Sequence, residues 1–326
     1  MSSAGKVLVT GCAGFIGSHL CERLVELGYV VIGVDAFTNY YSPRLKRYNI
    51  RNLLCNEKFK MIELDLSQVP VENLVHIVSK VDYIVHEAAQ PGVRSSWGIG
   101  FNEYIRHNIV ATQRLLESVV RVKNIRNFVY ASSSSVYGNQ LTVPFKEDML
   151  PRPHSPYGVT KLAAEHLCIT YSENYNIPIV IQRYFTVYGP RQRPDMAFHK
   201  FIRSMLLNAP IEIYGDGNQK RDFTYVRDVV NAVIRAIEIG NAAGEIINIG
   251  SSNPVRLLDV IKVLANMVGV EPNIVFRAKR KGDVEVTYAD ISKAKSILKW
   301  SPKVSLKEGL RAQIKWMKKI LDLNLV

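Results

Sequence analysis

Three glycines that follow a short apolar segment constrain this chain more than any other feature. Gly11, Gly14 and Gly17 come directly after the run Val7 to Thr10. A strand, a glycine-rich loop and the start of a helix, in this order, hold the pyrophosphate of a dinucleotide, because the backbone approaches the phosphates closely and free N–H groups point at them. The sequence therefore predicts a dinucleotide-binding site near the N-terminus.

The residues after the glycines complete this unit. Apolar residues recur at helical spacing from Ile16 to Leu27, Gly28 closes the helix, and a second apolar strand runs from Tyr29 to Val34. Asp35 ends that strand, where a carboxylate accepts hydrogen bonds from the adenosine ribose and repels a 2′-phosphate. Asp35 therefore favours NAD over NADP as the cofactor.

The length and composition are typical of a globular protein. The 326 residues, 47% of them hydrophobic, can bury a large core in one lobe or two. The first strand begins near Lys6, which leaves no room for a signal peptide, and no apolar stretch approaches the ~20 residues that span a bilayer. The cysteines, Cys12, Cys21, Cys55 and Cys168, lack metal-ligand spacing. We therefore expect a cytoplasmic protein without a membrane span or a metal site.

The formal net charge of +13 raises nucleic acid as a rival ligand. From Arg256 onward the chain carries 15 Lys or Arg and 7 Asp or Glu, so this segment holds 8 of the 13 excess charges. These charges lack the aromatic interleaving of a single-strand groove, and no groove-reading motif accompanies them. The pattern favours a solvated basic surface, or one that attracts a small anionic substrate, and we expect no nucleic-acid partner.

Further apolar strands alternate with helical stretches along the chain. They cover Phe59 to Leu64, Val81 to Val85, Phe128 to Ala131 and Ile179 to Arg183. This alternation predicts an α/β fold with a Rossmann-type, doubly wound parallel sheet. After a turn-rich segment that begins at residue 188, the chain changes character. We expect an NAD-binding domain over 1–190 and a smaller α/β substrate lobe over 191–326, with later pieces such as 245–249 returning to the sheet.

The candidate chemistry lies between residues 131 and 161. Four serines, 132–135, follow a strand, and Ser155 opens a helix that carries Tyr157 and Lys161 on one face. A tyrosine hydroxyl, with an ordinary pKa near 10, becomes a useful base only where nearby positive charge stabilises the phenolate, and the lysine ammonium and an oxidised nicotinamide both do this. Such a pair alone is typical of an exposed helix surface. Together with the dinucleotide motif and the serines, it predicts a catalytic base at Tyr157.

These motifs resemble those of the extended short-chain dehydrogenase/reductases, and within them the nucleotide-sugar epimerases. The resemblance covers essentially the whole chain. It rests on residues 10–17 (TGCAGFIG), 132–138 (SSSSVYG), 157–161 (YGVTK) and 183–190 (RYFTVYGP). It implies that NAD is held by the glycine loop and by residues that follow the strands: Gly11, Gly14, Phe15, Ile16, Gly17, Asp35, Lys46, Asp65, Leu66, Ala88, Ala89, Asn108, Tyr157, Lys161 and Tyr184.

The serine run indicates which reaction to expect. The resembling 4,6-dehydratases carry an Asp-Glu pair at the positions of Ser134 and Ser135, and the UDP-glucuronate decarboxylases carry Glu at Ser135. Dehydration needs a positioned acid and base, which hydroxyls do not supply. We therefore expect epimerisation at C4: Tyr157 takes the O4 proton, Ser133 hydrogen-bonds O4, Lys161 holds the nicotinamide ribose, and hydride leaves and returns to the opposite face.

Smaller differences bear on the substrate. Thr186, with 193–197 (RPDMA) after it, is similar to the UDP-glucuronate 4-epimerases, whereas other epimerases usually carry Asn at Thr186. Hydroxyls of Ser133, Ser134, Ser135 and Thr186 suit a uronate carboxylate. The resemblance assigns Arg193, Arg221 and Arg280 to the diphosphate and Asp283 to the uridine ribose. Each of these arginines could instead form a surface ion pair. Arg94 either reaches the sugar or phosphate or forms a surface ion pair as well.

Three alternatives remain open at this point. Thr287 is small where bulk restricts N-acetyl sugars in the resembling epimerases, so UDP-N-acetylglucosamine stands beside UDP-glucose as the alternative substrate. A non-catalytic NAD sensor is a third reading, although such proteins typically lack the active tyrosine.

The resembling enzymes dimerise through helices like those expected at 101–122 and 155–175, so we expect a homodimer. Leu115, Leu116 and Val119 fit either that interface or an ordinary core.

Overall fold

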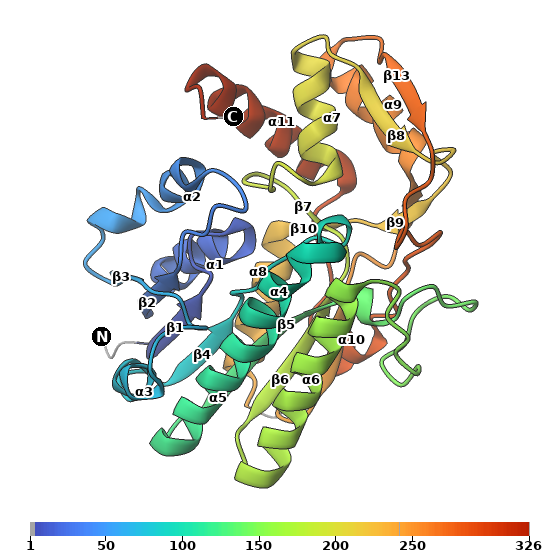
Figure 1. Cartoon of the computed structure of the whole chain (residues 1–326). Helices are drawn as coiled ribbons and strands as arrows, with labels where there is room; N and C mark the ends of the chain where they lie inside the picture. Colours follow the sequence, from blue (N-terminus) through green and yellow to red (C-terminus); the bar gives the residue numbers. More distant parts are fainter. Residues whose placement is uncertain (1–3, 241, 326) are drawn as a thin grey trace.

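A seven-stranded parallel sheet forms the centre of the computed structural model, which describes residues 4–240 and 242–325 (Figure 1). The strand order is β3-β2-β1-β4-β5-β6-β11, and every neighbouring pair is parallel. The strands are β1 Lys6–Thr10, β2 Val30–Asp35, β3 Phe59–Glu63, β4 Tyr83–His86, β5 Asn127–Ser133, β6 Ile179–Tyr184 and β11 Ile246–Ile249. The order reverses between β1 and β4, which is where open α/β sheets bind ligands.

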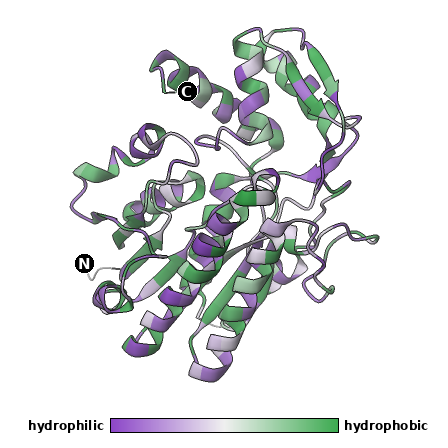
Figure 2. Cartoon of the chain, in the orientation of Figure 1, coloured by the Kyte–Doolittle hydropathy of each residue, from purple (hydrophilic) through white to green (hydrophobic). Residues whose placement is uncertain are grey.

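Successive side chains of each strand enter two different cores. Along β5, Phe128 and Tyr130 join one hydrophobic cluster, while Val129 and Ala131 join the other. Because helices cover both faces, most strand residues are apolar rather than alternating with polar ones, as the hydropathy colours show (Figure 2). The apolar runs in the sequence thus mark the strands correctly, and the predicted α/β fold with a doubly wound parallel sheet is confirmed.

Helices pack on both faces of this sheet. One face is covered by α3, α5 and α6, of which α5 contacts the other two, and the other face by α1 and α8. The helices of this part are α1 Phe15–Glu26, α2 Pro43–Ile50, α3 Val71–Val78, α4 Phe101–Tyr104, α5 Ala111–Val122, α6 Pro156–Tyr175, α8 Val226–Glu238 and α10 Ser292–Ile297. Leu115, Leu116 and Val119 of α5 are fully buried in the core, which settles their role.

The helix expected over 101–122 is interrupted. Between α4 and α5 the chain forms a π-helical segment, Ile105–Val110. The wider turn places Asn108 inward, where its side chain bonds the backbone of Gln90 and the hydroxyl of Thr160. π-Helical turns occur frequently at functional sites, and this one ties the loop after β4 to α6.

Most of the chain after residue 190 forms a smaller group above the carboxyl ends of the strands (Figure 1). Its helices α7, α9 and α11 contact one another, and short strands pair as β7 with β10, β8 with β13, and β9 with β12. Its elements are β7 Val187–Tyr188, α7 Ala197–Leu206, β8 Ile211–Tyr214, β9 Lys220–Asp222, β10 Thr224–Tyr225, β12 Pro254–Arg256, α9 Leu257–Val268, β13 Ile274–Arg277 and α11 Leu306–Asp322. In contrast, α8 and β11 belong to the central sheet and its helices.

Candidate active site

The glycine loop between β1 and α1 leaves open a cavity at the carboxyl edge of the sheet. Gly11 has a φ of +69°, which a side chain would strain. A Cβ added to Gly17 would lie 2.2 Å from the carbonyl oxygen of Gly11, so only glycine lets the helix approach the loop this closely. Gly14 begins α1 without a side-chain cap, so the N–H groups of the first turn have no side-chain acceptor at that position. This edge is shaped to receive an anionic group.

The cavity lining includes nearly all the residues predicted to hold the cofactor. The exception is Asn108, which does not line the cavity. Its side chain bonds the backbone of Gln90, and Gln90 does line it. The predicted residues that line it are Gly11, Gly14, Phe15, Ile16, Gly17, Asp35, Lys46, Asp65, Leu66, Ala88, Ala89, Tyr157, Lys161 and Tyr184. Arg193, predicted for the diphosphate of the substrate, lines the same cavity.

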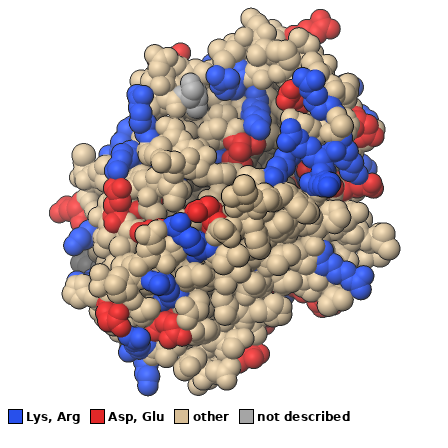
Figure 3. Space-filling model, in the orientation of Figure 1, with Lys and Arg blue, Asp and Glu red and all other residues tan. Residues whose placement is uncertain are grey.

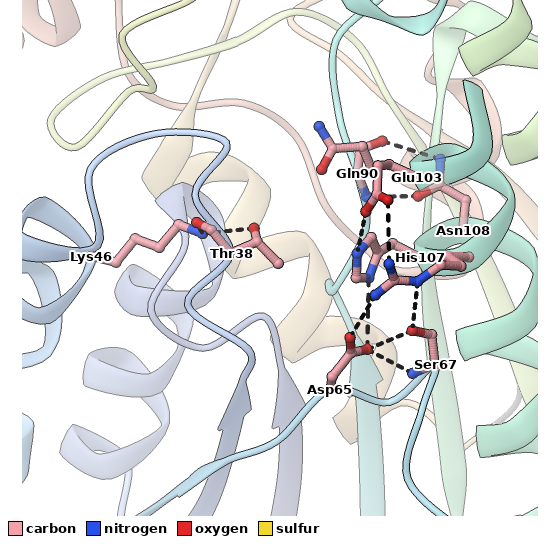
Figure 4. Close-up of polar contacts among 9 residues, drawn as sticks. Thr38, Lys46, Asp65, Ser67, Gln90, Glu103, His107 and Asn108 are labelled. Atoms are coloured by element: carbon pink, nitrogen blue, oxygen red, sulfur yellow. Dashed lines mark hydrogen bonds and ion pairs between the residues drawn. The ribbon is translucent and has the colours of Figure 1, made fainter. Parts of the chain in front are cut away.

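Asp35 and Lys46 lie at the end of the cavity formed by β2 and α2. The carboxylate of Asp35 accepts hydrogen bonds from the backbone N–H groups of Ala13 (3.0 Å) and Phe37 (2.8 Å), which fixes it at the end of β2. Lys46 is buried, and its ammonium donates to the backbone oxygen of Thr38 at 2.8 Å (Figure 4). Each carboxylate oxygen keeps acceptor capacity, so the predicted bonds from ribose hydroxyls to Asp35 remain available.

Asp65 anchors a polar network on the opposite side of the cavity. Its carboxylate accepts from the hydroxyl of Ser67 at 2.6 Å and pairs with Arg106 at 3.0 Å, and His107 lies between it and Glu103 (Figure 4). Burial opposes its charge, yet the Ser67 bonds and the neighbouring His107 and Arg106 hold the pKa of Asp65 below its ordinary value. The resemblance implies a role for Asp65 but not for the partners that keep it ionised.

The predicted catalytic side chains meet where β5 ends and α6 begins. Ser155 caps α6 by accepting the N–H of Gly158 at 3.2 Å, which orients the first turn and with it Tyr157. Burial raises the pKa of Tyr157, while the nearby hydroxyl of Ser133 and the charge of Arg193 act to lower it. The hydroxyl of Ser133 therefore lies close enough to Tyr157 to act on its pKa.

Lys161 lies one turn further along α6 and is buried. Its ammonium donates to the carbonyl oxygen of Ala131 at 2.6 Å and to the hydroxyl of Tyr130 at 3.4 Å. Burial lowers the pKa of Lys161 to about 8, against the opposing charge of Glu87. The lysine is therefore held beside β5 by uncharged oxygen acceptors.

Glu87 is a cavity residue that the motifs do not identify. It follows β4 directly, lines the cavity with Tyr157 and Lys161, and accepts a hydrogen bond from the hydroxyl of Tyr184 at 2.7 Å. Burial raises the pKa of Glu87 to about 7, although the Tyr184 bond and the charge of Lys161 oppose this rise. Its position after a strand, directly before two alanines, is the signal in the sequence that could have indicated it.

The other predicted substrate residues lie in two places. Ser134 and Ser135 form a short 3-10 turn, Ser134–Val136, after β5, and Thr186 lies between β6 and β7. Arg193 is held by Asp195 through two hydrogen bonds of 3.0 Å, which fixes its guanidinium at the cavity.

A second group gathers around Tyr214 at the end of β8, where Figure 3 shows Lys and Arg side chains concentrated. The guanidinium groups of Arg94 and Arg280 lie 4.4 and 4.2 Å from the ring centre of Tyr214, and Arg94 pairs with Asp283 at 3.1 Å. Arg221 donates to the backbone oxygen of Val284 at 2.6 Å, and burial lowers its pKa to about 10. A pocket lined by Tyr214, Arg221 and Asp283 opens here. Four of the five residues predicted for the nucleotide end, Arg94, Arg221, Arg280 and Asp283, therefore lie together, whereas the fifth, Arg193, lines the first cavity.

Metal sites and membrane-spanning helices are both absent from the described part of the chain. Within 4–240 and 242–325, no cluster of three or more His, Cys, Asp or Glu side chains is arranged to hold a metal ion. In the same residues, no helix is both long and apolar enough to cross a bilayer.

Comparison with known proteins places this geometry in context. The family model described as GDP-mannose 4,6 dehydratase matches residues 8–313. An uncharacterized UDP-glucose epimerase, YtcB, of Bacillus subtilis is 46% identical over 96% of this chain and 98% of its own length. A UDP-glucuronate 4-epimerase of Thermodesulfobacterium geofontis is 38% identical over 98% of both chains. The crystal structure of UDP-glucuronic acid 4-epimerase from Bacillus cereus, in complex with UDP-glucuronic acid and NAD, superposes with a TM-score of 0.93 at 46% identity, covering 97% of this chain and 99% of that one.

Proposed function

Because the chain belongs to the GDP-mannose 4,6 dehydratase family, we propose that it is an NAD-dependent 4-epimerase of UDP-sugars, which converts UDP-glucuronate to UDP-galacturonate. The resemblance to nucleotide-sugar epimerases is confirmed by relatives and structures of that kind. One observation carries the choice of reaction: Tyr157 and Lys161 line the cofactor cavity with Ser133 beside Tyr157, while positions 134 and 135 carry hydroxyls where dehydration would need an acid and a base.

The residues of the cavity fit NAD. The close approach of Gly17 to Gly11 leaves room for a pyrophosphate against the first turn of α1, and Asp35 at the end of β2 suits a ribose without a 2′-phosphate. The first 190 residues supply most of this site, which supports their assignment as the NAD-binding domain. NAD, when bound, supplies the hydride acceptor and donor that oxidation and re-reduction at one carbon require.

The roles of the three catalytic residues follow from their chemistry and their places at the ends of β5 and α6. Tyr157 accepts the proton of the sugar O4 and later returns it, and Ser133, whose hydroxyl lies near Tyr157, donates to the same oxygen. Lys161, fixed by the carbonyl of Ala131, stabilises the Tyr157 phenolate with its positive charge and would hold the nicotinamide ribose. The proton that leaves O4 returns to O4, so the reaction needs no further acid.

Hydroxyl donors support a uronate as the preferred substrate. Ser134, Ser135 and Thr186 follow the ends of two neighbouring strands, β5 and β6, at the edge where the sugar would lie. A 4-keto uronate is a β-keto acid that can lose carbon dioxide. Holding its carboxylate with hydroxyls, with no acid at Ser135, limits that loss.

The group around Tyr214 suits the other end of the substrate. Arg94, Arg221 and Arg280 concentrate positive charge beside the smaller lobe, and arginine forks match phosphate oxygens. Asp283, at the same place, accepts hydroxyl hydrogen bonds and so suits the uridine ribose. These contacts support the assignment of 191–326 as the UDP-sugar lobe.

Assembly and location are part of the same proposal. We expect a homodimer formed through the helices α5 and α6, which lie side by side in Figure 1; the surface over α6 in Figure 3 carries few charges, and Val159 and Tyr175 of α6 are exposed. Light scattering on the purified protein measures this.

The free cysteines are consistent with the reducing cytoplasm, where we place the enzyme.

The test uses purified protein without added NAD. The protein is incubated separately with UDP-glucuronate, UDP-glucose and UDP-N-acetylglucosamine, and the anomeric proton of the sugar is followed by NMR. We expect the 4-epimer of UDP-glucuronate to form fastest. Faster turnover of either neutral sugar would overturn the argument from the hydroxyls but keep the epimerase mechanism, whereas absence of turnover with every substrate, even after NAD is added, would favour the sensor.

A further inference from the structure

The roles described above leave the carboxyl group of Glu87 unused. It lines the same cavity as Tyr157 and Lys161, and the Tyr184 hydroxyl, 2.7 Å away, holds one of its oxygens. Tyr184 itself is buried at the end of β6. A carboxyl group fixed in this way, in the lining of the cavity that also holds Tyr157 and Lys161, affects the charges around it because little water screens the interaction.

The protonated state of Lys161 depends on a nearby negative charge. Its hydrogen bonds go to the uncharged oxygens of Ala131 and Tyr130, which leave the ammonium without compensation of its charge. Glu165, on the same helix, is the other carboxylate whose charge reaches Lys161, but it is engaged by Arg183 through contacts of 3.0 and 2.7 Å. Glu87 is therefore the carboxylate in position to balance Lys161.

Six other titratable groups face the pair from the elements packed around it. They are Tyr157 and Cys168 on α6, Tyr130 on β5, Tyr184 on β6, Cys21 on α1 and His86 on β4. Burial raises the pKa values of the tyrosines and cysteines among them and lowers that of His86, so all six are neutral near pH 7. The charges that change near neutral pH are those of Glu87 and Lys161.

We propose that Glu87, oriented by Tyr184, is a positioning residue that keeps Lys161 protonated and thereby sets the upper pH limit at which Tyr157 works as a base. This rests on the proposed function, since it gives Tyr157 and Lys161 their catalytic roles. Above the pKa of Glu87, its carboxylate stabilises the ammonium of Lys161. The ammonium in turn stabilises the phenolate of Tyr157. When Lys161 loses its proton at high pH, this stabilisation is lost, and Tyr157 no longer works as the base.

The direct test measures the titration of Lys161 by NMR in the purified holoenzyme, with lysine labelled with carbon-13 at Cε. The resonance that disappears in Lys161→Arg is that of Lys161. We expect Glu87→Gln to lower the pKa of Lys161 by about one unit, the lower end of the effect of a nearby opposite charge. Glu87→Asp, which keeps the charge, should restore most of the wild-type value. An unchanged Lys161 titration in Glu87→Gln would overturn the proposal.

A second variant covers the case in which Glu87→Gln fails to fold. Tyr184→Phe removes the hydrogen bond that favours the ionised carboxylate, so Glu87 stays protonated to higher pH, and the pKa of Lys161 should fall in the same direction by less. Glu147→Gln is the matched control: this carboxyl is also partly buried, bonds the backbone of Asn248, and lies outside the cavity lining. It should leave Lys161 unchanged, and an equal shift in this control would overturn the proposal.

The activity profile gives an independent readout. With UDP-glucuronate, the alkaline limb of kcat/KM should move to lower pH in Glu87→Gln by the same amount as the Lys161 titration, and an alkaline limb that stays in place would refute control of Tyr157 by Glu87. The NMR titration needs no substrate. A shift of Lys161 in an enzyme that turns over no UDP-sugar would therefore reject the proposed function and leave the charge pairing standing.

Discussion

Replacing Gly17 with alanine tests whether the glycine loop must lie so close to α1. The added Cβ would lie 2.2 Å from the carbonyl oxygen and 2.9 Å from the carbonyl carbon of Gly11, and 3.1 Å from the Cα of Cys12. These are backbone atoms, so the loop itself has to move. Overpacking costs about 1–3 kcal/mol, and the better helix propensity of alanine offsets about 1 kcal/mol of it. The free energy of unfolding should therefore fall by a net of about 0–2 kcal/mol.

Affinity for NAD is the sharper readout, because a displaced loop no longer directs its N–H groups into the cavity. We expect at least a tenfold loss, about 1.4 kcal/mol, by calorimetry on protein freed of cofactor. Two further alanine variants test whether the loss of NAD affinity follows the closeness of the added Cβ to the loop. Gly14→Ala meets the oxygen of Gly11 at 3.1 Å and should have a smaller effect, whereas an added Cβ on Gly240 meets nothing within 4 Å, so Gly240→Ala should bind NAD normally.

The ranking of the three variants is what the reasoning predicts. If Gly17→Ala bound NAD as tightly as Gly240→Ala while remaining folded, close packing of the loop against α1 would not be required for the cofactor, and the fit of this cavity to NAD would lose its main support.

Three further perturbations separate chemistry, product and stability. Tyr157→Phe should abolish epimerisation but leave NAD bound, and substantial residual turnover by NMR would remove Tyr157 as the base. Ser135→Glu should divert part of the UDP-glucuronate to a UDP-pentose through loss of carbon dioxide; an unchanged product by mass spectrometry would contradict the role given to Ser135. Glu165→Gln removes one partner of the buried ion pair with Arg183, so urea unfolding should show a loss of about 3–5 kcal/mol, and a loss under about 1 kcal/mol would argue against that pairing.

Local spacing made the cofactor loop and the catalytic pair predictable. Gly11, Gly14 and Gly17 lie close together in the sequence, in one loop and the helix turn that follows it. Tyr157 and Lys161 share a helix face because they are four residues apart. The doubly wound sheet followed from apolar runs that are buried on both faces. None of these inferences needs knowledge of which strands are neighbours.

The interactions that the sequence did not reveal join distant segments. Glu165 accepts from Ser132 and Arg183, which lie on β5 and β6, so the pairing exists only once those strands are adjacent to α6. The π-helical segment around Asn108 is equally hidden, because its wider turn is held by bonds to Gln90 and Thr160 rather than by local propensity. Amphipathic spacing alone predicts an ordinary helix there.

Glu87 lies between these two cases, and parallel topology explains why. Every strand of a parallel sheet delivers the residues at its carboxyl end to the same edge, so Gly11 after β1, Asp35 at the end of β2 and Ser132 near the end of β5 all line one cavity. Glu87 follows β4 in the same way, and Tyr184 ends β6. The rule that finds Asp35 thus also finds Glu87, whereas a search by motif passes over a single carboxylate before two alanines. What the rule does not give is the partner: β4 and β6 both flank β5, and only that order brings the Tyr184 hydroxyl to the carboxylate, 97 residues away along the chain. A titratable group that ends a central strand is therefore a candidate for the site on the strength of the sequence alone, and its partner is expected on the next strand but one.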